Sequence, residues 1–93
     1  MNSYSGALKI KKYLMARWSS DIRDRGNDAP YAYSRTKLKS TGLEAYTGGA
    51  GAAIIWEGFY EWTKLDEIKT MERILKDTGL TVFVTEPWVV EVF

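Results

Sequence analysis

The side chains of this sequence that could do acid–base chemistry are carboxylates, because its 93 residues include no histidine and no cysteine. Glu57 with Glu61, or Asp66 with Glu67, could supply a general acid and a general base, or oxygen ligands for a hard cation such as Mg²⁺. No calcium-loop spacing and no convergent aspartate cluster accompanies these pairs. We therefore expect ordinary surface carboxylates, with no catalytic residue and no metal ligand among them.

The missing residue types exclude several mechanistic classes. Ser/His/Asp and Cys/His catalysis, zinc sites built on thiolate or imidazole, and haem ligation by histidine all need histidine or cysteine. A disulfide framework is excluded for the same reason. We expect a protein that is not an enzyme and that holds no cofactor.

Aromatic side chains concentrate after a glycine-rich run, in the stretch TGGAGAAIIWEGFYEW of residues 47–62. Aromatic rings dominate small hydrophobic cores, so core packing is one interpretation of this segment. Tryptophan and tyrosine are also enriched in the hot spots of protein interfaces, and an acidic aromatic surface would suit a basic groove on a partner. The partner-binding hypothesis uses six residues: Trp56, Glu57, Phe59, Tyr60, Glu61 and Trp62.

A second pattern mixes tyrosines with cations at every other position of residues 31–40. If this segment is a strand, one of its faces carries Tyr31, Tyr33, Arg35, Lys37 and Lys39. Rings that stack on unpaired bases, interleaved with cations that follow phosphates, are typical of single-stranded nucleic-acid binding. The alternative is a solvated edge strand, because the pattern lacks the glycine-aromatic signature of the RNA recognition motif.

The charges of the chain are distributed unevenly although the net charge is only +1. Residues 1–40 hold nine Lys/Arg and three Asp/Glu, whereas residues 41–93 hold four Lys/Arg and nine Asp/Glu. Such a chain can pair its charges internally, pair head to tail with another copy, or offer one pole to an oppositely charged partner.

The periodicity of apolar residues predicts two helices. The first covers residues 5–24, with Ser5 as its N-cap and Gly26 after its end. The second covers residues 64–78, with Thr63 as its cap. Its buried stripe would consist of Leu65, Ile68, Met71, Ile74 and Leu75.

Four segments have strand character. Residues 31–40 read as an edge strand, residues 41–46 as a short strand or extended loop, and residues 52–56 as a strongly apolar central strand. The β-branched C-terminal segment 80–93 predicts two strands that meet near Pro87, which cannot lie inside a central strand.

The order α-β-(β)-β-α-β-β indicates a small α+β fold in a single domain, residues 1–93. We expect an antiparallel sheet of about four strands with two helices packed on one face. The C-terminal valines lie on both faces of their strands, so these strands must be buried on both sides or covered by another chain, as in a homodimer formed by sheet extension or face packing.

These observations favour a small non-enzymatic protein-binding module, such as an accessory regulator or inhibitor of the kind that phages and other mobile elements encode. It would act through the residue 56–62 surface or through a sheet edge. The alternative is a single-stranded nucleic-acid-binding protein, with a nucleotide sensor on the Gly48–Gly51 loop as a third class. No apolar run is long enough to span a bilayer, so we expect a cytoplasmic location and no membrane partner.

Overall fold

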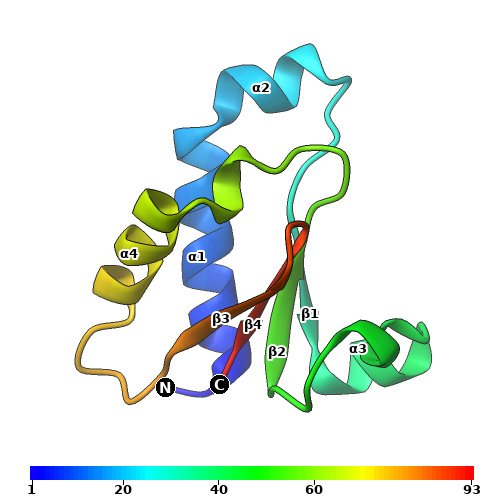
Figure 1. The fold of residues 1–93 in the computed structure, drawn as a ribbon, viewed down its shortest axis with the longest axis vertical. Coiled ribbons are helices and arrows are strands. Elements are labelled where there is room, and N and C mark those ends of the chain that lie inside the picture. Colours follow the sequence, from blue (N-terminus) through cyan, green and yellow to red (C-terminus); the bar gives the residue numbers. More distant parts are fainter.

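Four short strands form one antiparallel sheet in the order β1-β2-β4-β3 in the computed structural model, which describes all 93 residues (Figure 1). Strand β1 spans Tyr31–Ser34, β2 spans Ala52–Ile55, β3 spans Val82–Glu86 and β4 spans Val89–Val92. Strands β2 and β4 are central, and all their residues are buried. The prediction of a central strand at residues 52–56 is therefore confirmed, and β1 and β3 are the two edges.

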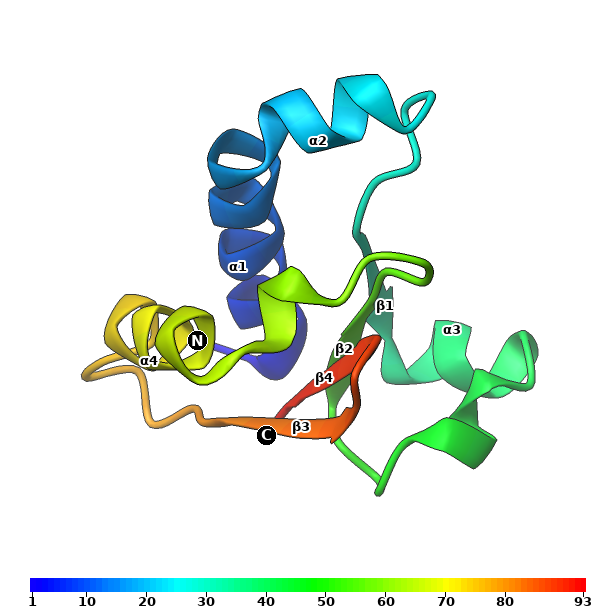
Figure 2. The ribbon, with the colours of Figure 1, turned by 45° about the horizontal axis from the view of Figure 1, so that its top comes forward.

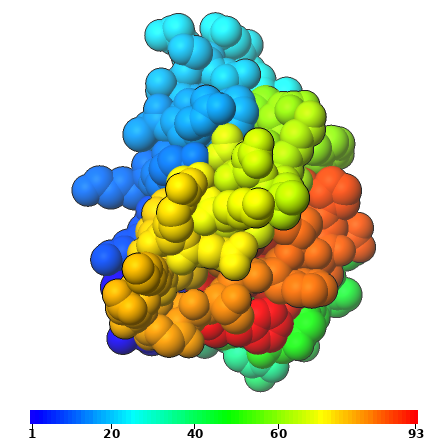
Figure 3. Space-filling view, turned by 60° about the vertical axis from the view of Figure 1, so that its left-hand side comes forward, coloured from blue at the N-terminus to red at the C-terminus, as the bar shows by residue number.

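Two helices cover one face of the sheet, as predicted. Helices α1 (Ser3–Arg17) and α4 (Leu65–Ile74) lie on the same side in both ribbon views (Figures 1 and 2). Their buried residues pack on alternate residues of the central strands. The main core consists of Ala7, Ile10, Leu14, Ile22, Ala32, Ala52, Ile54, Trp56, Trp62, Met71, Leu75, Val90 and Val92. In Figure 3, α4 (yellow) lies between α1 (blue) and residues of the C-terminal hairpin (orange and red).

The opposite face of the sheet is covered in part by a helix that the sequence did not predict. Helix α3 (Arg35–Ser40) lies on this face, and its Leu38 packs with Ala53, Ile55 and Val89 in a second, smaller core (Figure 2). The segment expected to be one strand over residues 31–40 is thus strand β1 followed by α3. The physical reason is local: the Ser34 hydroxyl oxygen accepts a hydrogen bond from the Lys37 N–H at 3.2 Å, which caps a helix.

The first predicted helix is two helices, α1 and α2 (Ser19–Asp24), because the backbone leaves helical geometry at Trp18. Asn2, and not Ser5, is the N-cap, since its side-chain oxygen accepts from the Ser5 N–H at 2.8 Å. After the break, the Trp18 ring and the Ile22 side chain both pack against the main core. Gly26 follows α2 with a positive φ of 69°, as expected.

The second predicted helix is shorter than expected, and its cap was assigned wrongly. Thr63 belongs to the short helix η2 (Glu61–Thr63), and its hydroxyl donates to the Pro87 carbonyl at 2.7 Å. This bond ties the start of α4 to the β3–β4 turn. Met71 and Leu75 are buried as predicted, but Leu65 is exposed because Trp62 fills the core at this end of the helix.

The remaining segments differ in how well they follow the prediction. Residues 80–93 form a hairpin of β3 and β4 that turns at Pro87, as expected. Residues 41–46 form no strand, because Gly42 adopts a positive φ of 75° and leads into the short helix η1 (Leu43–Tyr46). None of the helices has both the length and the apolar character that a membrane crossing requires.

Candidate functional site

The aromatic segment of residues 56–62 points mostly into the core. Trp56 and Trp62 are 1% and 0% exposed, and the Trp62 indole N–H donates to the Trp56 carbonyl at 3.3 Å. Trp56 follows β2 on the face that meets α1 and α4, and its ring lies 4.6 Å from that of Phe59 between centroids. These rings are core residues and are not available to the partner-binding surface that the sequence suggested, because they continue the apolar face of a central strand.

The outward residues of this segment do not form an aromatic patch. Tyr60 is 51% exposed, with Glu57 and Glu61 exposed on either side of it. Glu61 forms an exposed ion pair with Lys64, at 2.8 Å between Oε2 and Nζ. A single tyrosine between two solvated carboxylates lacks the packed centre that interface hot spots have.

The residues expected to share one nucleic-acid-binding face are divided between a strand and a helix. Tyr31 and Tyr33 lie on one face of β1 with ring centroids 4.7 Å apart, and the Lys11 ammonium lies 5.3 Å from the Tyr31 ring centroid. Arg35 instead donates to the Ala50 carbonyl at 3.1 Å. Lys37 and Lys39 belong to helix α3, and side chains two residues apart in a helix point to different sides of it. The five-residue face therefore does not form.

A hollow of about 430 Å³ lies beside the edge strand β3, on the sheet face that α3 covers only in part. Phe83 stands directly opposite Glu91 in the β3–β4 pairing, and Phe93 follows Glu91 by two residues, so all three side chains share this face. Phe83 and Phe93 are 61% and 43% exposed, whereas Glu91 is 1% exposed. Seven residues line the hollow: Gly48, Thr81, Val82, Phe83, Thr85, Glu91 and Phe93.

The buried carboxylate of Glu91 has a single hydrogen-bond partner. Its Oε1 accepts from the backbone N–H of Gly48, and no group donates to its Oε2. No lysine or arginine forms an ion pair with it. A buried charge with so few partners is costly unless a cation or further donors reach it. The hollow therefore combines the exposed rings of Phe83 and Phe93 with the Glu91 carboxylate, which forms no ion pair within the protein.

Gly48, in the glycine run, contacts the Glu91 carboxylate through its backbone N–H. The Gly48 backbone N–H donates to Glu91 Oε1, and a Cβ at Gly48 would lie 3.4 Å from Glu91 Oε2, an ordinary van der Waals distance. The Gly48 N–H is thereby occupied by an acid, and a phosphate at the same place would be repelled. This geometry argues against a phosphate-binding role for the Gly48–Gly51 loop.

The outer edge of β3 carries backbone groups that point away from the sheet. Thr81 and Phe93 exchange two hydrogen bonds, at 3.0 and 2.9 Å, which sets the alternation of the β3–β4 ladder. Val82 and Val84 then stand in non-hydrogen-bonded pairs, and their N–H and C=O groups face outward. Such an edge is a template for another extended chain. A bulge between Val84 and Glu86 ends the regular edge.

Sequence reasoning missed this site, although one signal was present. Residues 89–93 read Val-Val-Glu-Val-Phe, where one acidic residue interrupts an otherwise apolar strand. A carboxylate in such a run either breaks the strand or has a reason to be buried. Nothing in the sequence places Phe83 and Gly48 beside Glu91.

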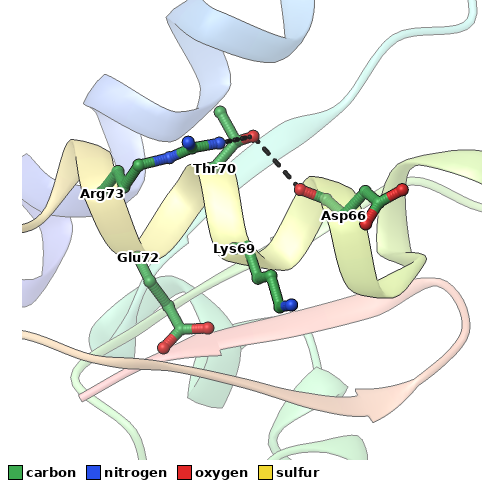
Figure 4. Close-up of a pocket in the computed structure, with 5 residues that line it drawn as sticks. All are labelled: Asp66, Lys69, Thr70, Glu72 and Arg73. Atoms are coloured by element: carbon green, nitrogen blue, oxygen red, sulfur yellow. Dashed lines mark hydrogen bonds between the residues drawn. The ribbon is translucent and has the colours of Figure 1, made fainter.

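The carboxylate pairs considered for acid–base chemistry are not arranged for it. Glu67 turns inward, where its Oε2 accepts from the Tyr13 hydroxyl at 2.6 Å and its Oε1 lies 3.3 Å from Arg17 Nε. Asp66 lines an open depression on the outward side of α4, together with Lys69, Thr70, Glu72 and Arg73 (Figure 4). In this depression Arg73 donates to the Thr70 hydroxyl at 3.0 Å, and that hydroxyl donates to the Asp66 carbonyl at 3.1 Å. The structure holds no group of three or more acidic side chains able to bind a metal ion.

Two tyrosines have raised pKa values for structural reasons. Burial, followed by the hydrogen bond and the negative charge of Glu67, raises the pKa of Tyr13 above its ordinary value of 10.0. Burial, followed by the neighbouring Tyr31 and Glu57, raises the pKa of Tyr33. Both groups stay neutral at physiological pH, so neither supplies a base, and the Tyr13–Glu67 bond joins α1 to α4.

Comparisons with known proteins add no relative: no protein-family model, no curated protein and no solved structure matches this chain.

Proposed function

We propose that this protein is a non-enzymatic binding module that recognises a protein partner by adding an extended segment of that partner to the free edge of β3. The observation that carries the proposal is the outward-facing backbone of Val82 and Val84 beside a hollow framed by Phe83 and Phe93. In strand addition, main-chain hydrogen bonds supply affinity, and pockets for alternate side chains supply specificity. The β3 edge offers both.

The sequence-based hypothesis had two parts, binding through a sheet edge and binding through an aromatic and acidic surface. The sheet edge remains, while the aromatic surface is formed by Phe83 and Phe93, next to the buried carboxylate of Glu91, in place of residues 56–62. A small domain that binds a partner in this way could act as an accessory regulator or inhibitor. Pairing with β3 would cover the partner's segment and keep it from other contacts. The homodimer stays a prediction, because β3 could also pair with β3 of a second copy.

The experiment that tests the proposal removes one outward N–H. In Val84→Pro the missing N–H faces solvent, so the β3–β4 ladder keeps its hydrogen bonds, and proline is tolerated on such an edge. Val84→Thr is the matched control, because it changes the side chain and keeps the N–H. A displayed library of random peptides is selected on the wild-type protein and on both variants.

We expect enriched peptides to bind the wild type and Val84→Thr but to lose binding to Val84→Pro. Circular dichroism and thermal unfolding establish that both variants are folded. Peptides that bind all three proteins equally, or a library with no enrichment on the wild type, would refute strand addition at β3.

Single-stranded nucleic-acid binding is the second candidate function, and a specific observation favours it. Tyr31 is half-exposed, its ring is tilted at 46° to that of Tyr33, and the Lys11 ammonium lies 5.3 Å from its ring centroid, so a ring and a cation are presented together. The site for this function would use Lys11 from α1 in place of Lys37 and Lys39.

A further inference from the structure

The Glu91 carboxylate is the one charged group that lines the β3 hollow, so it decides which kind of side chain the hollow would bind. It is 1% exposed, only one of its oxygens accepts a hydrogen bond, and none of the four ion pairs of the protein includes it. A buried carboxylate in this state gains most from a cationic donor, because charge-assisted hydrogen bonds are the strongest that it can accept. An apolar occupant would leave Oε2 without a partner.

The two phenylalanines fit the rest of a long cationic side chain. Phe83 and Phe93 stand exposed at the hollow that Glu91 floors, so their rings can cover the methylene stem of an arginine or lysine. An aromatic face also attracts a nearby cation. The hollow therefore offers an apolar wall for the stem and an acid for the charged end.

The charge of the hairpin argues against a second copy that pairs through its own β3. No lysine or arginine follows Lys76, and residues 77–93 contain Asp77, Glu86 and Glu91. Pairing β3 with β3 of another copy would supply no cation to either hollow, because β3 contains no lysine or arginine. A basic extended segment is complementary in charge as well as in backbone geometry.

We infer that the β3 hollow receives an arginine or lysine side chain, so that the partner of this protein is a basic segment that adds to β3 as a strand. This inference rests on the proposed function and makes it more specific. The cationic residue of the segment stands on the same side of the extended sheet as Phe83, with its charged end at Glu91 Oε2.

The test uses four synthetic probes that share one strand-forming sequence, acetyl-Thr-Val-Xaa-Val-Thr-amide. Xaa is arginine, citrulline, leucine or glutamate, and citrulline matches arginine in shape without its charge. Each probe is titrated into ¹⁵N-labelled full-length protein, and the dissociation constant is measured from the shifts of the Gly48, Phe83 and Glu91 amides. The titrations are repeated with Glu91→Gln, whose amide oxygen can still accept from the Gly48 N–H, and with Val84→Pro.

We expect the arginine probe to bind the wild type at least about 10-fold more tightly than the citrulline probe. In Glu91→Gln this preference should disappear while the citrulline and leucine probes bind as before. Val84→Pro should weaken all probes.

The outcomes separate the two proposals. Equal binding of the arginine, citrulline and leucine probes, lost in Val84→Pro, would overturn the cationic pocket and leave strand addition standing. Binding of no probe at millimolar concentration would count against both. A wild-type dimer in sedimentation experiments that Val84→Pro converts to monomer would show that a second copy occupies the edge, and would overturn the inference.

Discussion

Replacement of Tyr13 by phenylalanine removes one hydroxyl from the contact between α1 and α4. The hydroxyl donates to Glu67 at 2.6 Å, and Glu67 is buried to 8% exposure, so this is a charge-assisted bond in a shielded place. Hydrogen bonds to charged groups contribute about 1.5–3 kcal/mol. Arg17 remains 3.3 Å from Glu67 after the change, so the carboxylate keeps a partner and the lower end of that range applies.

We therefore expect Tyr13→Phe to lower the free energy of unfolding by about 1.5 kcal/mol, and Tm by roughly 6–12 °C for a domain of this size. Urea and thermal unfolding followed by circular dichroism measure both quantities. Tyr60→Phe is the control, because the Tyr60 hydroxyl is exposed and makes no hydrogen bond within the protein. A Tm of Tyr13→Phe within about 2 °C of the wild type would contradict this expectation, because such a change is too small for the loss of a charge-assisted hydrogen bond.

The same contact predicts a pH dependence with a definite sign. The pKa of Tyr13 is raised in the folded state, so the folded protein holds this proton more tightly than the unfolded chain does. The resulting stability is complete below the unfolded pKa of about 10 and is lost as the pH rises through the folded value. As the pH rises above the unfolded pKa of about 10, the wild type should therefore lose more stability than Tyr13→Phe does. Parallel curves for the two proteins would contradict this assignment.

Three further outcomes test other parts of the structure. Trp62→Ala should lower the free energy of unfolding by about 3–5 kcal/mol, whereas Tyr60→Ala should change it by less than about 0.5 kcal/mol in the same denaturant titrations. Ser34→Ala removes the α3 cap and should destabilise the protein by about 1 kcal/mol, visible as faster amide hydrogen exchange in α3; unchanged exchange would contradict the capping role. If the protein binds single-stranded oligonucleotides, Lys11→Ala should reduce the salt slope of binding by about 1, and unchanged binding after Tyr31→Ala would remove the nucleic-acid alternative.

The sequence predicted the fold class because its strongest signals are local. Apolar residues at helical spacing, a β-branched C-terminal segment interrupted by Pro87 and an apolar run at residues 52–56 each report on their own element. These predictions are confirmed by α1, α4, the β3–β4 hairpin and β2. The alternation of residues 31–40 was also local, but a competing local signal was stronger, since Ser34 caps a helix within the segment.

The direction in which a side chain points was not determined by composition. Trp56 and Trp62 have the residue types of an interface hot spot, and only the packing of α1 and α4 on their side of the sheet decides that they are core residues. The same sequence pattern on the opposite face would have been exposed. For these two rings, the core-packing interpretation of the segment is therefore confirmed.

The residue types and local patterns are enough to predict the absence of imidazole and thiol groups, two packed helices and a C-terminal hairpin. The place where the Glu91 carboxylate meets the Phe83 and Phe93 rings depends on tertiary packing. Glu91 and Gly48 are 43 residues apart in the chain, and strand pairing sets Phe83 opposite Glu91. Register and long-range contacts depend on the free energy of the whole core, so no local pattern can report them.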